Sequence, residues 1–247
     1  MISSKNIQET LIYVVVTLVT YVILQAVTIV IHEFVHSTTA WLLGYMPSPL
    51  SIVWGNPVTM RGWDEGVPYD QLFPSTGNPA QALIGGSPLV FHTIVVTVGL
   101  LLLQRPWMTN RKWLFHTLYW FVVISLMELI SYIVMRPFAP GGDTFHINHG
   151  LALSPWILFV AGTLLIIVAL YFLFTRVLPL LCEIMAPGNR LAYWAIVLMT
   201  AFILFLWGSG IRAMSMYPDP QWMFGLIGIV AFVFAVFASD QYGYVRG

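Results

Sequence analysis

Charged residues are scarce in this sequence, and cysteine is almost absent. Only 8% of the 247 residues are charged and 59% are hydrophobic, whereas a soluble domain usually has about 25% charged residues. Such an apolar chain cannot cover a water-facing surface with polar groups, which excludes an ordinary soluble protein and indicates an integral membrane protein. The single cysteine, Cys182, excludes an internal disulfide and a cysteine-rich metal site.

The sequence also lacks an excess of either charge. Lys and Arg together number 10, as do Asp and Glu together, so the formal net charge is zero. Nucleic-acid binding depends largely on positive charge that neutralises phosphates. We therefore expect no nucleic-acid partner, and we expect the lipid bilayer to surround the chain.

Long apolar runs recur along the chain. A helix needs about 20 mainly apolar residues to cross the hydrocarbon core of a bilayer. The predicted spans are residues 11–31, with helical character continuing to about 43, then 83–103, 113–135, 155–174, 191–207 and 222–238. The predicted fold class is an all-α integral membrane protein with about six transmembrane helices. Because no internal repeat divides the chain, residues 1–247 are expected to form a single polytopic membrane domain.

Basic residues divide unequally between the two sides of this predicted bundle. The side that carries the N-terminus holds Lys5, Arg105, Arg111, Lys112, Arg176, Arg190 and Arg246, and the other holds Arg61, Arg136 and Arg212. Loops rich in Lys and Arg tend to stay in the cytoplasm. The distribution therefore predicts that both termini are cytoplasmic.

The longest connection, residues 44–82, contains a hairpin-like pattern. Residues 50–54 form a short strand-like run, the Gly-Asn-Pro sequence at 55–57 is typical of a turn, and residues 58–60 form a second short run. A hairpin at membrane depth must be buried in protein or line a cavity. The alternative is an ordinary loop that lies on the membrane interface.

The sequence His32-Glu33-Phe34-Val35-His36 carries the clearest chemistry. Two histidines four positions apart lie on one face of a helix, close enough to share one cation. Glu33 lies about 100° around the helix from His32, so it can reach a metal-bound water without being a ligand. Ionisable residues inside a membrane helix are functional candidates. The pattern predicts a zinc hydrolase in which Glu33 is the general base, and the alternative is a polar helix end that packs on a neighbour.

A catalytic zinc has three protein ligands and a water, so a third ligand must come from elsewhere. The segment 140–149, Pro-Gly-Gly-Asp-Thr-Phe-His-Ile-Asn-His, follows the third predicted span and lies on the same side as the end of the first. Asp143 is the preferred ligand, His146 is the second choice, and His149 follows. The alternative is that Asp143 only caps the helix after it.

Two further polar residues lie within predicted spans. Glu128, in the third span, is a candidate partner of a ligating histidine, and the alternatives are a third ligand or a bond to a neighbouring helix. His92, in the second span, is interpreted as a hydrogen-bonding residue between helices rather than as a ligand.

Together these motifs resemble the site-2 protease family of intramembrane zinc metalloproteases. The resemblance rests on the HExxH sequence in an early span, an Asp after a Pro/Gly-rich stretch about a hundred residues later, and a Gly-Gly-Ser-Pro-Leu element at residues 85–89. It implies one Zn²⁺ bound by His32, His36 and Asp143, with Glu33 as base. It covers a metalloprotease-like core of about residues 8–150, and additional helices follow at about 151–240.

The resemblance also suggests how a substrate is held. The hairpin-like run is similar to the membrane-embedded strands with which that family binds an extended substrate, which would be strand addition. Val53, Trp54 and Asn56 are accordingly the expected substrate-binding residues. The expected substrate is a membrane protein or peptide.

Three functions are consistent with the sequence. The preferred one is an intramembrane zinc metalloprotease, because Glu33 beside two histidines serves hydrolysis. The first alternative is a membrane zinc hydrolase that acts on lipid amides or esters, since the same Lewis-acid chemistry would serve. The second is a non-enzymatic metal-binding transporter, for which paired broken helices would be the signature.

Overall fold

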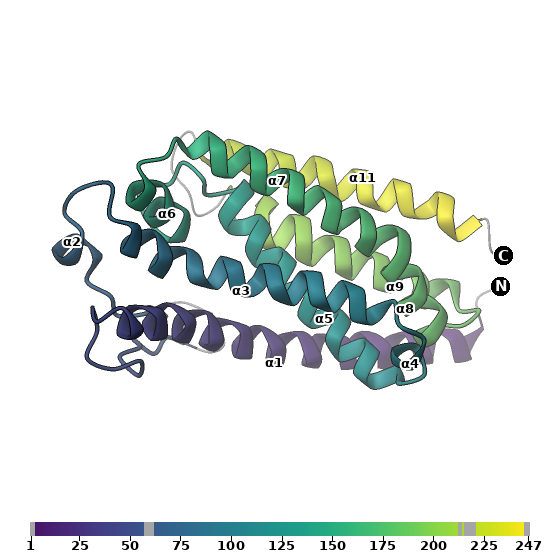
Figure 1. Cartoon of the computed structure of the whole chain (residues 1–247). Coiled ribbons are helices and arrows are strands. Elements are labelled where there is room, and N and C mark those ends of the chain that lie inside the picture. Colours follow the sequence, from purple (N-terminus) through teal and green to yellow (C-terminus); the bar gives the residue numbers. More distant parts are fainter. Residues whose placement is uncertain (1–2, 57–61, 212–213, 215–220, 245–247) are drawn as a thin grey trace.

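The structure is a computed structural model that describes residues 3–56, 62–211, 214 and 221–244. Long helices run side by side along one axis (Figure 1). The α-helices are α1 (Ser4–Leu42), α2 (Tyr69–Leu72), α3 (Pro79–Leu103), α4 (Pro106–Thr109), α5 (Lys112–Leu129), α6 (Asp143–Leu151), α7 (Pro155–Phe172), α8 (Leu178–Met185), α9 (Arg190–Ala201) and α11 (Phe224–Tyr244). Three wider, π-helical segments, η1 (Ile130–Val134), η2 (Leu173–Val177) and η3 (Phe202–Gly210), continue α5, α7 and α9, and a short 3₁₀ turn, η4 (Gln221–Met223), precedes α11.

Five helical stretches in the described part of the chain are long and apolar enough to cross a membrane. They are Ser4–Leu42, Pro79–Leu103, Lys112–Val134, Pro155–Met185 and Arg190–Gly210. They confirm the prediction of an all-α, multi-pass membrane protein. The sixth predicted span, 222–238, coincides with a shorter apolar helix, Phe224–Ser239, so the count of six stays a prediction.

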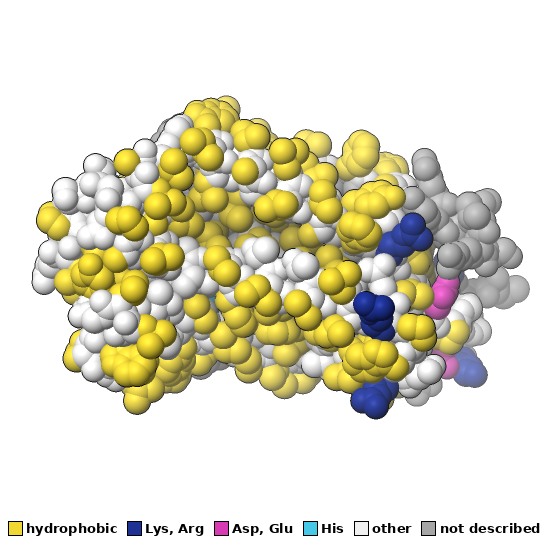
Figure 2. All heavy atoms as spheres, in the orientation of Figure 1, with side chains coloured by type: hydrophobic (Ala, Val, Ile, Leu, Met, Phe, Trp, Pro, Cys, Tyr) yellow, Lys and Arg dark blue, Asp and Glu magenta, His cyan; other side chains and the backbone are white. Residues whose placement is uncertain are grey.

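The sides of the bundle are covered with apolar side chains. Figure 2 shows them along the visible face, whereas the visible Lys and Arg side chains gather at the end where α1 begins. Large residues such as Val19 and Ile23 of α1 and Leu165 of α7 are more than half exposed. Because exposed apolar surface on this scale is stable in hydrocarbon and not in water, the surface agrees with a membrane location.

Helix α5 forms the centre of the bundle. It packs against α1, α3 and η3. Its aromatic residues Phe115, Tyr119 and Trp120 are completely buried, and the Tyr119 hydroxyl bonds to the Thr200 hydroxyl at 2.8 Å. This buried hydrogen bond satisfies a polar group that would otherwise be unpaired in an apolar interior.

The connection between α1 and α3 contains one antiparallel bridge among the described residues. Val53 and Asp64 exchange backbone hydrogen bonds of 2.8 and 3.2 Å. The second strand of the expected hairpin, residues 58–60, lies outside the described residues. The hairpin therefore stays a prediction.

A close contact between α3 and α6 determines what faces the end of α1. Gly85 of α3 lies directly against His146 and the backbone of Asp143, so that a Cβ atom at position 85 would collide with both. Small residues permit this kind of close approach between membrane helices. As a result, Asp143 at the beginning of α6 lies beside His32 and His36 of α1.

Candidate metal centre

Helix α1 presents His32 and His36 together near its end. Residues 4–42 contain neither Gly nor Pro, so no helix breaker interrupts the turn that carries the two histidines. Their rings are 5.0 Å apart, centre to centre, and both side chains are buried. The predicted placement of two imidazoles on one helix face is therefore present in the structure.

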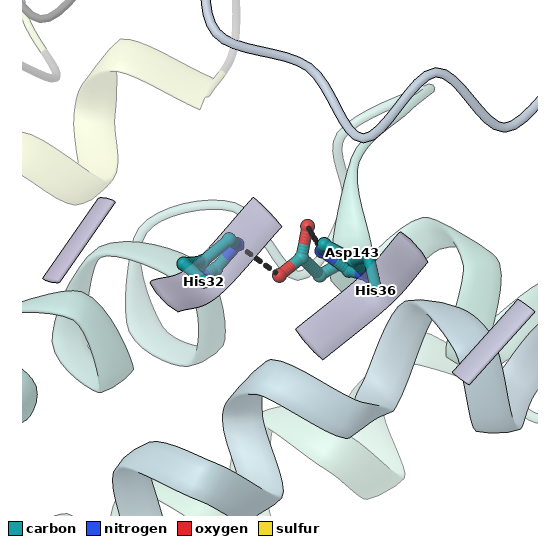
Figure 3. Close-up of side chains that lie close together, drawn as sticks. All are labelled: His32, His36 and Asp143. Atoms are coloured by element: carbon teal, nitrogen blue, oxygen red, sulfur yellow. Dashed lines mark ion pairs between the residues drawn. The ribbon is translucent and has the colours of Figure 1, made fainter. Parts of the chain in front are cut away.

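Asp143, the first residue of α6, points its carboxylate between the two imidazoles (Figure 3). Its Oδ2 lies 3.2 Å from Nε2 of His32, and its Oδ1 lies 3.5 Å from Nε2 of His36. One ligand atom from each of the three residues lies within 4.8 Å of the others. Residues more than a hundred positions apart thus form one compact, buried group.

A hydrogen bond determines which nitrogen of His36 faces this carboxylate. Nδ1 of His36 lies 2.7 Å from the carbonyl oxygen of Ile84. Because a carbonyl only accepts, Nδ1 must donate, and in a neutral imidazole Nε2 then carries a lone pair. That lone pair faces an oxygen of Asp143, so a cation or an additional proton is needed between the two atoms.

His32 is oriented by its neighbours. Its Nδ1 lies 3.2 Å from Nε2 of His92 on α3, and the ring of Tyr132 in η1 stacks on it at 5.4 Å with an interplanar angle of 19°. Histidines that bind metals usually use the second ring nitrogen for a bond of this kind, which fixes the orientation of the ring. His92 therefore contacts His32 and is not itself part of the group of His32, His36 and Asp143.

The spacing of these atoms fits a single tetrahedral cation. Ligand bonds of 2.0–2.1 Å, as zinc makes to histidine, separate two ligand atoms by about 3.4 Å. The observed separations of 3.2 and 3.5 Å lie on either side of that value, although they involve different oxygens of Asp143, and one atom from each residue lies within 4.8 Å of the others. Moreover, Oδ2 of Asp143 is buried and has no hydrogen-bond partner, although Nε2 of His32 is near. A donor set of two imidazoles and a carboxylate suits Zn²⁺.

Asp143 is held in its charged form. Burial by itself would raise the pKa of this carboxyl, but the neighbouring His36 and His32 lower it, and the resulting pKa lies well below the ordinary value. The position of Asp143 in the first turn of α6 also favours a negative charge. The carboxylate is therefore ionised at neutral pH, as a metal ligand must be.

Comparisons with known proteins add no relative. No family model, no curated protein and no solved structure matches the chain.

The other predicted metal-site residues lie around this group. Glu33 is partly buried and has a carboxylate oxygen within 4.8 Å of a His36 nitrogen. His146 bonds instead to Gln81 at 3.0 Å and stacks on Tyr69 at 3.6 Å. Burial lowers the pKa of His146 to about 4, so its ring is neutral and serves the contact between α6 and α3.

Glu128 lies further along the bundle. Its Oε1 accepts a hydrogen bond of 3.0 Å from Nε2 of Gln25 in α1. The partner of His32 in the structure is His92, which the sequence suggested only as a residue that bonds between helices. The sequence signal that could have identified His92 is an ionisable residue in the same predicted span as the Gly-Gly-Ser-Pro-Leu element at residues 85–89.

The expected substrate-binding residues lie beside the centre at the surface. Val53 and Trp54 are exposed, and the Trp54 ring contacts Phe34 of the HExxH sequence and Trp63. The carbonyl of Asn56 accepts a hydrogen bond from Nε1 of Trp63 at 3.3 Å. Sequence reasoning missed Glu65, which follows Asp64 in the bridge and has a carboxylate oxygen within 4.8 Å of Glu33 and His36.

Proposed function

We propose that the chain is an intramembrane zinc metalloprotease that hydrolyses peptide bonds of membrane-spanning or membrane-associated substrates. The observation that carries the proposal is the convergence of Nε2 of His32, Nε2 of His36 and the buried Asp143 carboxylate, with separations of 3.2 and 3.5 Å. A zinc ion held by these two residues and His32 would supply a Lewis acid and lower the pKa of water toward 7.

The residues of the chain then have distinct roles. Glu33 lies beside the centre without belonging to the group of His32, His36 and Asp143, so its carboxylate can take the proton of the attacking water and pass it to the leaving nitrogen. His92 and the Ile84 carbonyl hold the two imidazoles in orientation. Because the group is buried, bulk water would not compete with these residues for coordination of the metal.

The bridge near the centre favours a peptide substrate. Val53 pairs with Asp64 through its backbone, and in an extended segment the backbone groups of the residues on either side would point in the opposite direction. An extended substrate can pair at that edge, which would expose a peptide bond that a helix would keep hydrogen-bonded. Trp54, which lies against Phe34, would contact the substrate side chains.

The alternative functions have less support. An apolar groove lies between α7, η2, η3 and α11, but its lining includes none of the residues of the metal centre, so it offers no acyl-chain tunnel to them. A transporter has no evident need for Glu33.

With both ends of the chain in the cytoplasm, the metal centre would lie toward the opposite face of the membrane.

A comparison of membrane proteomes tests the function. Cells would express the wild type, Glu33→Gln or, as a matched control, Glu9→Gln, which makes the same change on α1 at the exposed Lys5–Glu9 pair. We expect uncleaved membrane proteins to accumulate with Glu33→Gln alone. Normal cleavage by Glu33→Gln would exclude the proposed mechanism, and accumulation of lipid amides or esters instead would favour the lipid hydrolase.

A further inference from the structure

Glu65 brings a second carboxylate to the metal centre from the opposite direction. Asp143 approaches the histidines from α6, whereas Glu65 belongs to the connection between α1 and α3. A carboxylate oxygen of Glu65 lies within 4.8 Å of both a Glu33 oxygen and a His36 nitrogen, although Glu65, like Glu33, is outside the group of His32, His36 and Asp143. Nδ1 of His36 is occupied by the Ile84 carbonyl, so the nitrogen available to Glu65 is Nε2, which also faces Asp143.

The local backbone holds Glu65 in this position. Its predecessor, Asp64, is paired with Val53 through two backbone hydrogen bonds. The Asp64 carboxylate also accepts a 2.7 Å bond from the backbone N–H of Gly66. Gly66 has a φ of +72°, and a Cβ atom there would collide with the carbonyl oxygen of Ser51. Only glycine fits this turn readily. The turn directs the Glu65 side chain toward α1, which carries Glu33 and His36.

The residues after the turn are anchored to the same helices as the metal centre. Val67, Tyr69 and Phe73 are buried together with Ala40 of α1 and Ile84 of α3. Burial and the nearby Glu65 carboxylate raise the pKa of the Tyr69 hydroxyl well above its ordinary value. Glu65 is thus fixed on both sides, by a bridge before it and by an apolar cluster after it.

We propose, on the basis of the proposed zinc function, that the Glu65 side chain turns toward a bound metal, becomes a fourth protein ligand and so closes the resting metal centre. Catalytic zinc sites leave one position for water, whereas sites with four protein ligands are closed. A second carboxylate among the ligands would also strengthen the attraction for a divalent cation, because charges are poorly screened in an apolar interior. Glu65 must therefore withdraw before a water and a peptide bond can occupy its position.

Full-length protein loaded with Co²⁺ in detergent tests this assignment without a substrate. The visible absorption reports coordination, and the relaxation rate of water protons reports whether an exchangeable water is bound to the paramagnetic ion. The variants are Glu65→Gln and Asp70→Asn, a matched control because Asp70 is an exposed acid in the same connection. Circular dichroism and thermal unfolding would show that each variant is folded.

We expect the wild type and Asp70→Asn to bind one Co²⁺ with no inner-sphere water. Glu65→Gln should gain one exchangeable water, change the visible spectrum and bind Co²⁺ about tenfold more weakly, because an anionic ligand has been removed. An inner-sphere water in the wild type would overturn the assignment and leave the zinc function intact, and so would an unchanged spectrum in a folded Glu65→Gln variant. Absence of Co²⁺ binding by the wild type would overturn both proposals.

Discussion

Nδ1 of His36 donates a hydrogen bond of 2.7 Å to the carbonyl oxygen of Ile84. The bond joins α1 to α3 and leaves the other ring nitrogen directed at Asp143. Because Ile84 is completely buried, its carbonyl has no water as an alternative partner and the bond is favoured. This relationship holds Nε2 of His36 in the direction that the proposed metal centre requires.

Metal content is the first quantity to measure. We expect purified wild-type protein to hold about one Zn²⁺. His36→Ala and Asp143→Asn should each lose most of it, because each change removes a ligand and weakens the hold on zinc against a chelator. Glu33→Gln should keep its metal, since Glu33 is assigned to proton transfer. Zinc is measured by elemental analysis after dialysis, and full retention by both His36→Ala and Asp143→Asn would contradict the centre.

His92 should tune metal affinity although it does not bind the metal. His92→Leu removes the partner of Nδ1 of His32, so we expect zinc affinity to fall by about 10-fold to 100-fold. His116→Leu is the matched control, because His116 is equally buried but bonds weakly to Thr20 at 3.4 Å. Competition with a fluorescent chelator measures both affinities. Equal affinity in the two variants would show that His92 does not orient His32.

The contact at Gly85 should link the packing of α6 to metal binding. Gly85→Ala places a Cβ atom against His146 and the Asp143 backbone, so α6 must move away from α3 and Asp143 must shift relative to the histidines of α1. We expect a loss of about 1–3 kcal/mol in the free energy of unfolding together with weaker zinc binding. Gly99→Ala collides with Val122 on α5 instead and should lose stability without weakening zinc binding. If both variants weaken binding equally, the effect is on the bundle as a whole.

Glu128 should contribute to stability and not to the metal centre. Glu128→Gln keeps an oxygen acceptor for Gln25, so we expect zinc affinity and thermal stability to stay near those of the wild type. Glu128→Leu leaves the buried amide of Gln25 unpaired, which should cost about 1–3 kcal/mol. Thermal unfolding in detergent and chelator competition separate the two effects. A tenfold loss of zinc affinity in Glu128→Gln would instead make Glu128 a partner of a ligand.

The sequence by itself determined the features that depend on neighbouring residues. Apolar runs long enough for a bilayer predicted the spanning helices, because the length of a run limits what can cross hydrocarbon. The spacing of His32 and His36 predicted that their rings share a face, since the helical repeat is the same in any context. Gly85 was visible as part of a motif, although its packing role was not.

Only the tertiary structure decided which distant groups meet at the end of α1. In the sequence, both Asp143 and His146 were candidates for the third ligand beside His32 and His36. The close approach of α6 to α3 at Gly85 directs Asp143 toward α1 and leaves His146 against Gln81. The nearness of Glu65 depends on a bridge and a turn whose geometry arises from contacts between segments. Such contacts depend on helix packing and loop closure, which no local sequence period encodes.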